Sequence, residues 1–194
     1  MAGGVYHVFA RGNRRQPIFL GDEDRRRYLA IWGAVATDLE WRCLAYCLMD
    51  NHVHHLVETP NPDLSRGVQL AHSTYSRRFN AEHGKSGHLF QGRFGSTLAR
   101  APDAVWSLAS YIALNPTRAE MCERPEQYVW SSHAAALGAA PGPRWLDTQR
   151  LLSFYDPTPG AKALELYERI VEALRLMGAP GHGANAPTSP PHAR

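Results

Sequence analysis

The stretch that decides the fold is Trp41-Arg42-Cys43-Leu44-Ala45-Tyr46-Cys47-Leu48-Met49-Asp50-Asn51-His52-Val53-His54-His55-Leu56-Val57-Glu58. Residues 41–49 are apolar and aromatic enough for a strand, and residues 52–58 form a second such run. Between them, Asp50-Asn51 is a turn signal. We therefore predict two strands joined in an antiparallel hairpin.

The segments on either side of this hairpin predict further strands and helices. Before it, residues 5–11 predict a strand, and residues 21–39 predict a helix with acids in its first turn and apolar residues at helical spacing. After it we predict a helix at 64–81, a strand at 93–99 and a helix from about 102 to 115, which Pro116 is expected to end. This order predicts an α+β fold with a ferredoxin-like antiparallel sheet and added C-terminal helices.

The length and composition predict one domain with an extension. The chain has 194 residues, of which 44% are hydrophobic, and this is enough for one domain with a real core. We place this domain at residues 1–137. Residues 138–177 are expected to form a linker and a helical extension, with a helix at 161–177, that packs on the domain. Residues 178–194 are rich in glycine, proline, alanine and serine without periodicity, which predicts a disordered tail.

Cysteine usage and hydropathy exclude two classes of protein. Three cysteines without a CxxC pair disfavour a disulfide scaffold, and we expect Cys43 and Cys47 to be packing residues on one face of a strand. No early apolar run resembles a signal peptide, and no stretch approaches the roughly 18–20 apolar residues of a membrane-spanning helix. We therefore expect a cytoplasmic protein with no membrane partner.

Basic residues are concentrated in one segment of the chain. Lys and Arg number 21 against 18 Asp and Glu, a formal net charge of +3. Within residues 66–100, however, a single acid, Glu82, is outnumbered by basic residues, which are Arg66, Arg77, Arg78, Lys85, Arg93 and Arg100. This asymmetry indicates a surface that binds a polyanion, or alternatively a solvated basic face.

Two pairs of polar residues have the spacing of a catalytic site. His52 and His54 project from the same face of the predicted strand and could hold a metal ion, although surface or hydrogen-bonded histidines are commoner at this spacing. Tyr111 and Asn115 lie one turn apart on the predicted helix, where a lone tyrosine is more often a core residue. Two imidazoles and an amide oxygen leave coordination positions open, which suits a catalytic Mg²⁺ or Mn²⁺.

Five motifs between residues 6 and 132 resemble, in order, those of the REP-associated tyrosine transposases, members of the single-tyrosine HUH transposase and endonuclease superfamily. They are Tyr6-His7-Val8 with Arg11-Gly12-Asn13-Arg14-Arg15-Gln16-Pro17-Ile18-Phe19, Tyr46-Cys47-Leu48-Met49 with Asn51-His52-Val53-His54, Gly87-His88-Leu89-Phe90-Gln91-Gly92-Arg93-Phe94, Tyr111-Ile112 with Asn115-Pro116 and Arg118-Ala119, and Trp130-Ser131-Ser132. His55 departs from the family pattern, which usually has an aliphatic residue there. It affects packing rather than chemistry, because it is expected to point away from the metal face.

The resemblance implies the HUH endonuclease fold and a function. Tyr111 would be the nucleophile, and His52, His54 and Asn115 would bind a divalent metal, Mg²⁺ or Mn²⁺. The implied reaction is cleavage and rejoining of single-stranded hairpin DNA of the REP type through a 5′-phosphotyrosine intermediate. The candidates for DNA contacts are Arg11, Asn13, Arg14, Arg15, His88, Gln91 and Arg93. The REP-associated branch implies a monomer, with a homodimer as the alternative.

Three other functions remain open at this point. The chain could be a domesticated protein that binds hairpin DNA without cleaving it. It could be an HUH replication initiator or relaxase, with the same chemistry on another substrate. It could also be a metal-dependent hydrolase, which would normally need further histidine or carboxylate ligands that the sequence does not obviously provide.

Overall fold

The structure is a computed structural model that describes residues 3–158 and 160–178. Its strands are β1 (Gly4–Arg11), β2 (Arg42–Met49), β3 (His52–Thr59) and β4 (Gly95–Ala99). The long helices are α1 (Asp22–Asp38), α2 (Leu64–Glu82), α3 (Pro102–Arg118) and α6 (Ala161–Leu176), and the short ones are η1 (Asn13–Arg15), η2 (Pro125–Gln127), α4 (His133–Ala136) and α5 (Thr148–Leu152). The predicted hairpin is β2 and β3.

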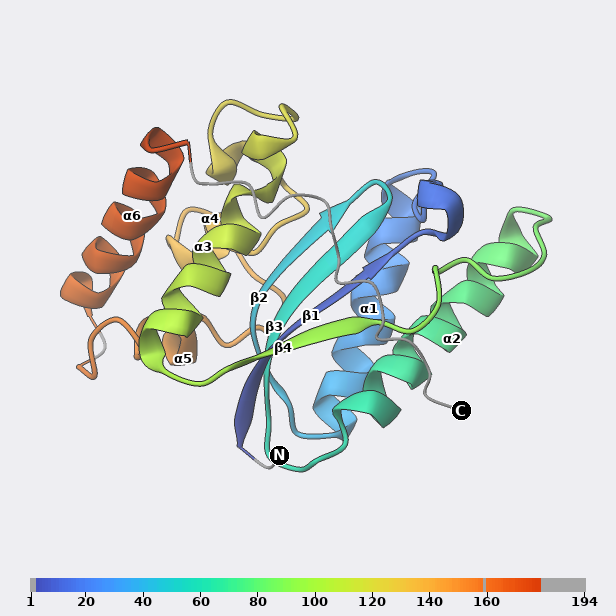
Figure 1. Ribbon diagram of the computed structural model, residues 1–194, viewed down its shortest axis with the longest axis horizontal. Coiled ribbons are helices and arrows are strands. Elements are labelled where there is room, and N and C mark those ends of the chain that lie inside the picture. Colours follow the sequence, from blue (N-terminus) through green and yellow to red (C-terminus); the bar gives the residue numbers. More distant parts are fainter. Residues whose placement is uncertain (1–2, 159, 179–194) are drawn as a thin grey trace, which may run out of the picture.

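The strands form a single antiparallel sheet in the order β2-β3-β1-β4. β1 and β3 are the central strands, and their register pairs Phe9 with His54 and Arg11 with His52. Helices α1 and α2 lie on one face of the sheet, and α3 lies on the other, with α6 packed on its outer side and α5 against β2 (Figure 1). The predicted α+β fold, a ferredoxin-like sheet with added C-terminal helices, is confirmed.

Each face of the sheet has its own hydrophobic core. The core under α1 and α2 includes Trp32, Tyr75 and Phe79, and the core under α3 includes Ile112 and Leu114, all almost fully buried. Burying a side chain of this size stabilises the fold by about 1.5–3 kcal/mol. Both faces of β1 and β3 are therefore covered, which holds these two strands rigidly in the middle of the molecule.

A bulge in β2 overturns one prediction. Cys43 and Cys47 are both buried, as expected, but they lie on opposite faces of the sheet. The register against β3 shifts between Cys43 and Ala45, and an extra residue in a strand reverses the face on which the following side chains emerge. Cys43 accepts a hydrogen bond from Trp32 Nε1 at 3.3 Å in the α1 layer, whereas Cys47 belongs to the α3 core.

The predicted end of the third long helix is also wrong. We expected it to end at Asn115, but α3 continues through Pro116 to Arg118. Pro116 lies in the last turn, where it removes only its own N–H hydrogen bond, and the Ala119 N–H still donates to the Asn115 carbonyl at 3.1 Å. The additional turn brings Arg118 onto the side of α3 that carries Tyr111.

The C-terminal part of the described chain packs on α3. Tyr167 and Val171 of α6 are buried in the core under α3. The bounds of α6, Ala161–Leu176, are close to those of the helix predicted at 161–177. The predicted tail, apart from Gly178, lies outside the described residues, so the division at residues 137 and 178 stays a prediction. Among the helices that the structure describes, none is long and apolar enough to cross a membrane.

Candidate active site

His52 and His54 lie side by side on β3 and face α3. Their ring centroids are 5.0 Å apart, and His54 is buried while His52 is half-buried. The alternation of side chains along the strand sends His55 to the opposite face, where it stacks on Trp32 with 3.6 Å between ring centroids. His55 thus lies in the α1 layer, and the pair that faces α3 is the pair that the sequence predicts.

Helix α3 brings Tyr111 and Asn115 to this histidine pair. The Tyr111 ring meets the His54 ring edge to face, with 5.4 Å between centroids, and it is half-buried. Asn115 donates from Nδ2 to the Tyr111 carbonyl at 2.8 Å, and its side chain also hydrogen-bonds with His52. The four residues that sequence analysis selected for the chemistry therefore meet in one place, although they come from two elements far apart in the chain.

His7 of β1 completes the buried part of the site. Its Nε2 lies 2.9 Å from His54 Nδ1, and its ring centroid is 5.7 Å from that of Tyr111. The sequence analysis quoted His7 within a motif but did not select it. His7 lies two residues before Phe9, which pairs with His54, so His7 and His54 emerge on the same face of the sheet; this depends on the strand register, which the sequence alone did not give.

Burial keeps these histidines neutral. It lowers the pKa of His7 from 6.5 to about 4 and that of His54 well below the ordinary value, with the neighbouring His7 lowering the latter further. The pKa of His52 is lowered by burial and by the charge of Arg11, and the hydrogen bond with Asn115 opposes this. At neutral pH the imidazoles of this group are therefore uncharged, which is the form in which histidine binds metal ions.

The donor atoms fit an open divalent-cation site. His54 Nε2 is buried and has no hydrogen-bond partner among the described residues, a costly arrangement that a bound cation would remove. Asn115, whose side chain hydrogen-bonds with His52, has an amide oxygen that could serve as a further ligand. Within residues 3–158 and 160–178, no group of three or more His, Cys, Asp or Glu side chains is arranged to hold a metal, so a closed structural site is not supported there.

Arg118 is a site residue that the sequence analysis missed. Its guanidinium carbon lies 5.2 Å from the centre of the Tyr111 ring, two helical turns from that residue. Desolvation lowers the pKa of Arg118, and the neighbouring Tyr111 opposes this. The missed signal is the spacing of seven residues between Tyr111 and Arg118, which places both on one side of a helix only if the helix extends past Asn115.

The proposed DNA contacts gather at the end of the sheet that carries His52. Three loops meet there: the loop after β1, the turn between β2 and β3, and the loop before β4. Backbone hydrogen bonds join them, including Gly12 N–H to the Asn51 carbonyl at 2.7 Å and Gln91 N–H to the Arg11 carbonyl at 2.8 Å. All the candidates are exposed except Arg11, which is half-buried; they are Arg11, Asn13, Arg14, Arg15, His88, Gln91 and Arg93. The structure thus brings together residues from two distant parts of the sequence.

The geometry of the first of these loops depends on Gly12. A Cβ atom at this position would lie 2.1 Å from the Gln16 carbonyl oxygen, so only glycine lets the loop close. Arg14 and Arg15 both have left-handed backbone geometry, with φ of 53° and 60°, which is unusual for residues other than glycine. Such geometry turns two adjacent arginines outward at the end of β1.

A model of the family "Transposase IS200 like" matches residues 2–115. The chain belongs to the IS200-like transposase family. The match spans the sheet, α1, α2 and α3 up to Asn115, so it includes His52, His54 and Tyr111. A transposase-like role in DNA processing follows from this membership, and the resemblance noted in the sequence is confirmed at this level.

One solved structure shares the fold of this IS200-like transposase, and a second match is weaker. A REP-associated tyrosine transposase, determined bound to a REP hairpin, is 17% identical and superimposes with a TM-score of 0.61 over 76% of this chain and 90% of its own. A protein from Deinococcus radiodurans R1 assigned as a transposase is 19% identical, with a TM-score of 0.42 over 60% of this chain and 84% of its own. No curated protein sequence matches the chain.

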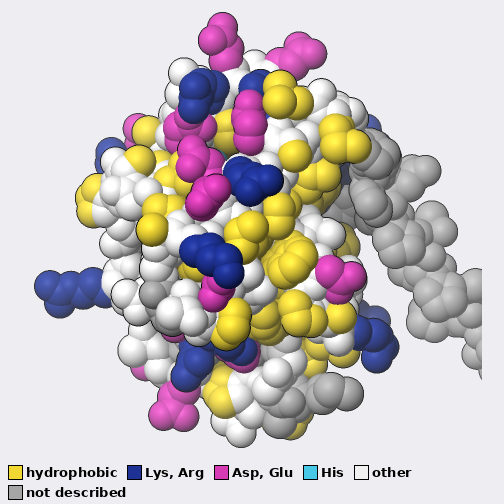
Figure 2. Space-filling model, turned by 90° about the vertical axis from the view of Figure 1, so that its left-hand side faces the viewer, with side chains coloured by type: hydrophobic (Ala, Val, Ile, Leu, Met, Phe, Trp, Pro, Cys, Tyr) yellow, Lys and Arg dark blue, Asp and Glu magenta, His cyan; other side chains and the backbone are white. Residues whose placement is uncertain are grey.

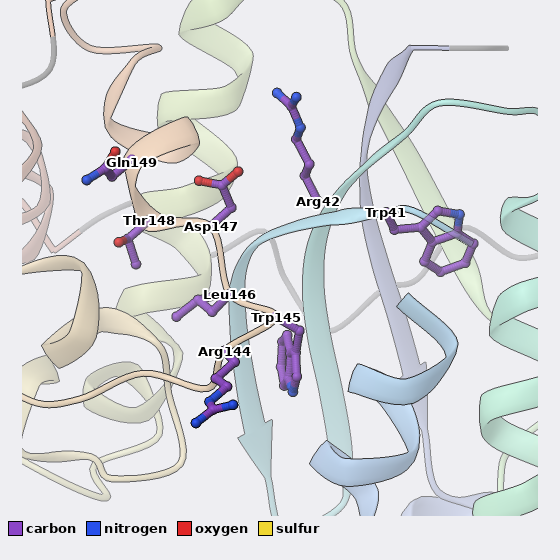
Figure 3. Close-up of a pocket in the computed structure, with 8 residues that line it drawn as sticks. All are labelled: Trp41, Arg42, Arg144, Trp145, Leu146, Asp147, Thr148 and Gln149. Atoms are coloured by element: carbon purple, nitrogen blue, oxygen red, sulfur yellow. The ribbon is translucent and has the colours of Figure 1, made fainter. Parts of the chain in front are cut away.

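A pocket of about 330 Å³ lies away from the candidate site of this transposase, at the start of β2 (Figure 3). It is lined by Trp41, Arg42, Arg144, Trp145, Leu146, Asp147, Thr148 and Gln149.

The surface of the molecule on the side where α6 lies is mixed in charge, with acidic and basic side chains interleaved among apolar ones (Figure 2). Neither feature has the uniformly basic character that a DNA backbone would favour.

The motif Trp130-Ser131-Ser132 acquires a structural role. This segment runs along the outer edge of β2, where the Leu48 N–H donates to the Trp130 carbonyl at 2.9 Å and the Ser132 N–H donates to the Tyr46 carbonyl at 3.0 Å. Ser132 Oγ also accepts from the Tyr46 N–H at 2.9 Å. These bonds cover an otherwise open sheet edge in the transposase, which protects it from pairing with another chain.

Proposed function

We propose that this chain is an endonuclease and strand transferase that cleaves and rejoins single-stranded hairpin DNA of the REP type. The observation that carries the proposal is the position of Tyr111, whose ring lies 5.4 Å from that of His54, a histidine with an unpartnered nitrogen among the described residues. A hydroxyl nucleophile beside a candidate metal-binding nitrogen is what phosphodiester cleavage through a covalent intermediate requires.

In the proposed reaction Tyr111 Oη attacks the phosphorus of the scissile phosphodiester. The phenol loses its proton as the new O–P bond forms, and the bond from phosphorus to the 3′ oxygen breaks. That oxygen takes up a proton and leaves as a 3′-hydroxyl, while the 5′-phosphate stays on the tyrosine. A 3′-hydroxyl can reverse these steps, so the phosphodiester bond energy is retained for rejoining.

His52, His54 and Asn115 are the residues that would hold a divalent cation, Mg²⁺ or Mn²⁺. When bound there, such a cation supplies charge stabilisation at a phosphate oxygen. The neutral imidazoles and the amide oxygen of Asn115 are suitable donors without prior loss of a proton. Arg118, with its guanidinium over the Tyr111 ring, stabilises the negative charge that develops on the phenol oxygen.

The loops at the end of the sheet are the proposed DNA contacts. Arg14 and Arg15 are exposed there, and a guanidinium pairs with phosphate oxygens or a guanine edge in a bidentate manner. His88, Gln91 and Arg93 lie on the neighbouring loop, joined to β1 by backbone hydrogen bonds. A REP hairpin as the ligand is supported by the structure of the REP-associated tyrosine transposase with which this chain shares its fold.

A cleavage assay with an end-labelled hairpin tests the proposal. The wild-type protein is expected to form a covalent protein–DNA adduct in the presence of Mn²⁺, visible on a denaturing gel. The Tyr111→Phe variant is expected to form no adduct, because it lacks the attacking oxygen, while it still retards the hairpin on a native gel. Tyr155→Phe is the matched control and is expected to behave as wild type, since Tyr155 packs against Trp106 and Tyr167 in the core.

The same assay separates the alternatives. Retardation of the hairpin without any adduct from the wild-type protein would support a DNA-binding protein that does not cleave. Cleavage by Tyr111→Phe at the wild-type rate would contradict the assignment of the nucleophile. If the wild-type protein neither binds nor cleaves single-stranded hairpins, the proposed substrate class is wrong.

A further inference from the structure

The nitrogens of His52 and His54 that do not face the proposed cation both have hydrogen-bond partners. His54 Nδ1 lies 2.9 Å from His7 Nε2, and His52 Nδ1 lies 2.7 Å from Asn51 Oδ1. A neutral imidazole carries its single proton on one of its two nitrogens, and only the other can bind a cation. The partner of each Nδ1 therefore decides whether Nε2 carries the lone pair. At His52 the Asn115 side chain is a second hydrogen-bond partner, and its amide N–H can donate to a bare Nε2.

For His54, the surroundings favour a proton on Nδ1. If His7 donated to His54 instead, the His54 proton would lie on Nε2, which is buried and has no acceptor among the described residues. Buried N–H groups without a partner are rarer and costlier than a bare lone pair that can accept a ligand. His7 Nε2 is thus the acceptor, and His54 Nε2 is left with its lone pair free.

For His52, a chain of two hydrogen bonds gives the same result. Asn51 donates from Nδ2 to the Arg15 carbonyl at 3.1 Å, which fixes the orientation of the amide and turns its Oδ1 to His52. An amide oxygen only accepts, so the proton of the 2.7 Å hydrogen bond belongs to His52 Nδ1. The Arg15 carbonyl belongs to the loop that carries the proposed DNA contacts.

We infer that His7 and Asn51 are positioning residues that hold His54 and His52 in the tautomer protonated on Nδ1, with both Nε2 atoms available to a divalent cation. Such partners orient metal-binding histidines and set their tautomer in metal sites generally. This inference rests on the metal site of the proposed function. It adds that both histidines already have the metal-binding tautomer in the metal-free protein. It also adds that His52 is connected, through Asn51, to the loop that carries Arg14 and Arg15.

The tautomers can be measured directly in the full-length, metal-free protein. Long-range ¹H–¹⁵N spectra of protein labelled with ¹⁵N-histidine distinguish protonated from bare ring nitrogens. We expect both His52 and His54 to carry the proton on Nδ1. In His7→Phe only His54 should change, and in Asn51→Ala only His52 should change, so that each variant controls for the other. A wild-type spectrum with the proton on Nε2 of His54 and of His52 would overturn the inference.

Mn²⁺ titration of the same proteins supplies the second readout. Both variants are expected to bind Mn²⁺ roughly 10- to 100-fold more weakly than wild type, by calorimetry or electron paramagnetic resonance. His7→Gln is expected to recover part of the affinity, because its amide oxygen can accept from His54. His72→Phe is the matched control, since His72 is a buried histidine bonded to Tyr28 in the α1–α2 layer, and it should leave Mn²⁺ affinity unchanged.

The outcomes separate this inference from the proposal on which it rests. If wild-type protein binds no Mn²⁺, the proposed cation site fails, and the spectra alone still decide whether His7 and Asn51 set the tautomers. If Mn²⁺ binds and His7→Phe keeps both the wild-type affinity and the His54 tautomer, His7 has only a packing role and the inference is wrong.

Discussion

The candidate active site places several polar side chains where burial is expensive. His7 and His54 are buried at one end of the α3 core, and one ring nitrogen of His54 is left without a partner among the described residues. An unsatisfied buried polar atom of this kind costs about 1–3 kcal/mol. A hydrophobic side chain would avoid this cost, so the position of His54 beside Tyr111 is consistent with the metal-binding role that we propose for it.

Arg118 is expected to accelerate cleavage without contributing to folding. Arg118→Ala should lower the single-turnover rate of hairpin cleavage roughly 5- to 30-fold, the equivalent of about 1–2 kcal/mol of cation–π and charge stabilisation. Arg118→Lys should recover part of the rate because it keeps the charge. Rapid-quench assays at saturating protein measure this effect. Equal cleavage rates for wild type and Arg118→Ala would contradict a role for Arg118 in the reaction.

Arg14 and Arg15 are expected to contribute to DNA affinity by pairing with phosphates. Replacing either by Ala should weaken hairpin binding and reduce the slope of log affinity against log salt by about 1 for each phosphate that is no longer neutralised. Fluorescence anisotropy between low and moderate salt gives this slope. Arg169→Ala on α6, where Arg169 is paired with Glu165, is the control and should leave the slope as in wild type. An unchanged slope in the loop variants would contradict the proposed interface.

At the scale of elements, the site depends on β3 and α3 meeting across the sheet. The alternation along β3 was predictable from the sequence, because His52 and His54 are two residues apart in a run that reads as a strand, with the apolar Val53 between them. The bulge in β2 was not, because no local signal distinguishes a strand with one extra residue around Leu44. The extension of α3 past Pro116 was missed because a local rule on proline was applied to a position where only one helical turn remained.

Two buried histidines join helices to each other and should make stability dependent on pH. His133 Nδ1 lies 2.8 Å from Tyr167 Oη, between α4 and α6, and His72 Nε2 lies 3.3 Å from Tyr28 Oη, between α2 and α1. Burial lowers the pKa of both from 6.5 to about 4. Between these values the unfolded chain binds protons that the folded chain does not, so the folded state loses stability as the pH falls.

The free energy of unfolding should therefore decrease from about pH 6.5 to about pH 4, by up to about 1.4 kcal/mol per pH unit for each such histidine. Urea unfolding followed by circular dichroism at about pH 7.5, 6 and 5 measures it. His133→Asn, which keeps a polar side chain but cannot titrate, should have a shallower pH dependence than wild type. A constant free energy of unfolding across this series would show that these histidines are not buried in their neutral form.

At the scale of the whole molecule, one chain contains every residue of the candidate site. Tyr111 lies next to His54 of its own chain, so no second copy is needed to bring the nucleophile to the metal-binding residues. The expectation of a monomer stays a prediction. The sequence predicted the sheet well, because the strand patterns are local, and the structure brings together the four residues predicted for the chemistry, whose roles stay predictions. It did not indicate the contact between His7 and His54, which depends on the pairing of two strands far apart in the chain, and it missed Arg118 because the helix was expected to end at Asn115.

Mixing two inactive variants tests whether the site is complete in one chain. Tyr111→Phe lacks the nucleophile and His54→Ala lacks a metal-binding residue, so each is expected to be inactive alone. An equimolar mixture should remain inactive, because no chain in it has both residues in place. Recovery of about a quarter or more of wild-type cleavage would indicate a dimer that exchanges α3 between chains, in contrast to the arrangement seen here.

The central claim, that Tyr111 is the nucleophile, is tested most directly by mass spectrometry of the covalent adduct. Trypsin releases residues 101–118 as one peptide in which Tyr111 is the single tyrosine. After incubation with a hairpin and Mn²⁺ and digestion of the DNA, this peptide is expected to carry a nucleotide linked through its 5′-phosphate to Tyr111. A nucleotide on another residue, or hairpin cleavage with residues 101–118 unmodified at every time point, would contradict the account.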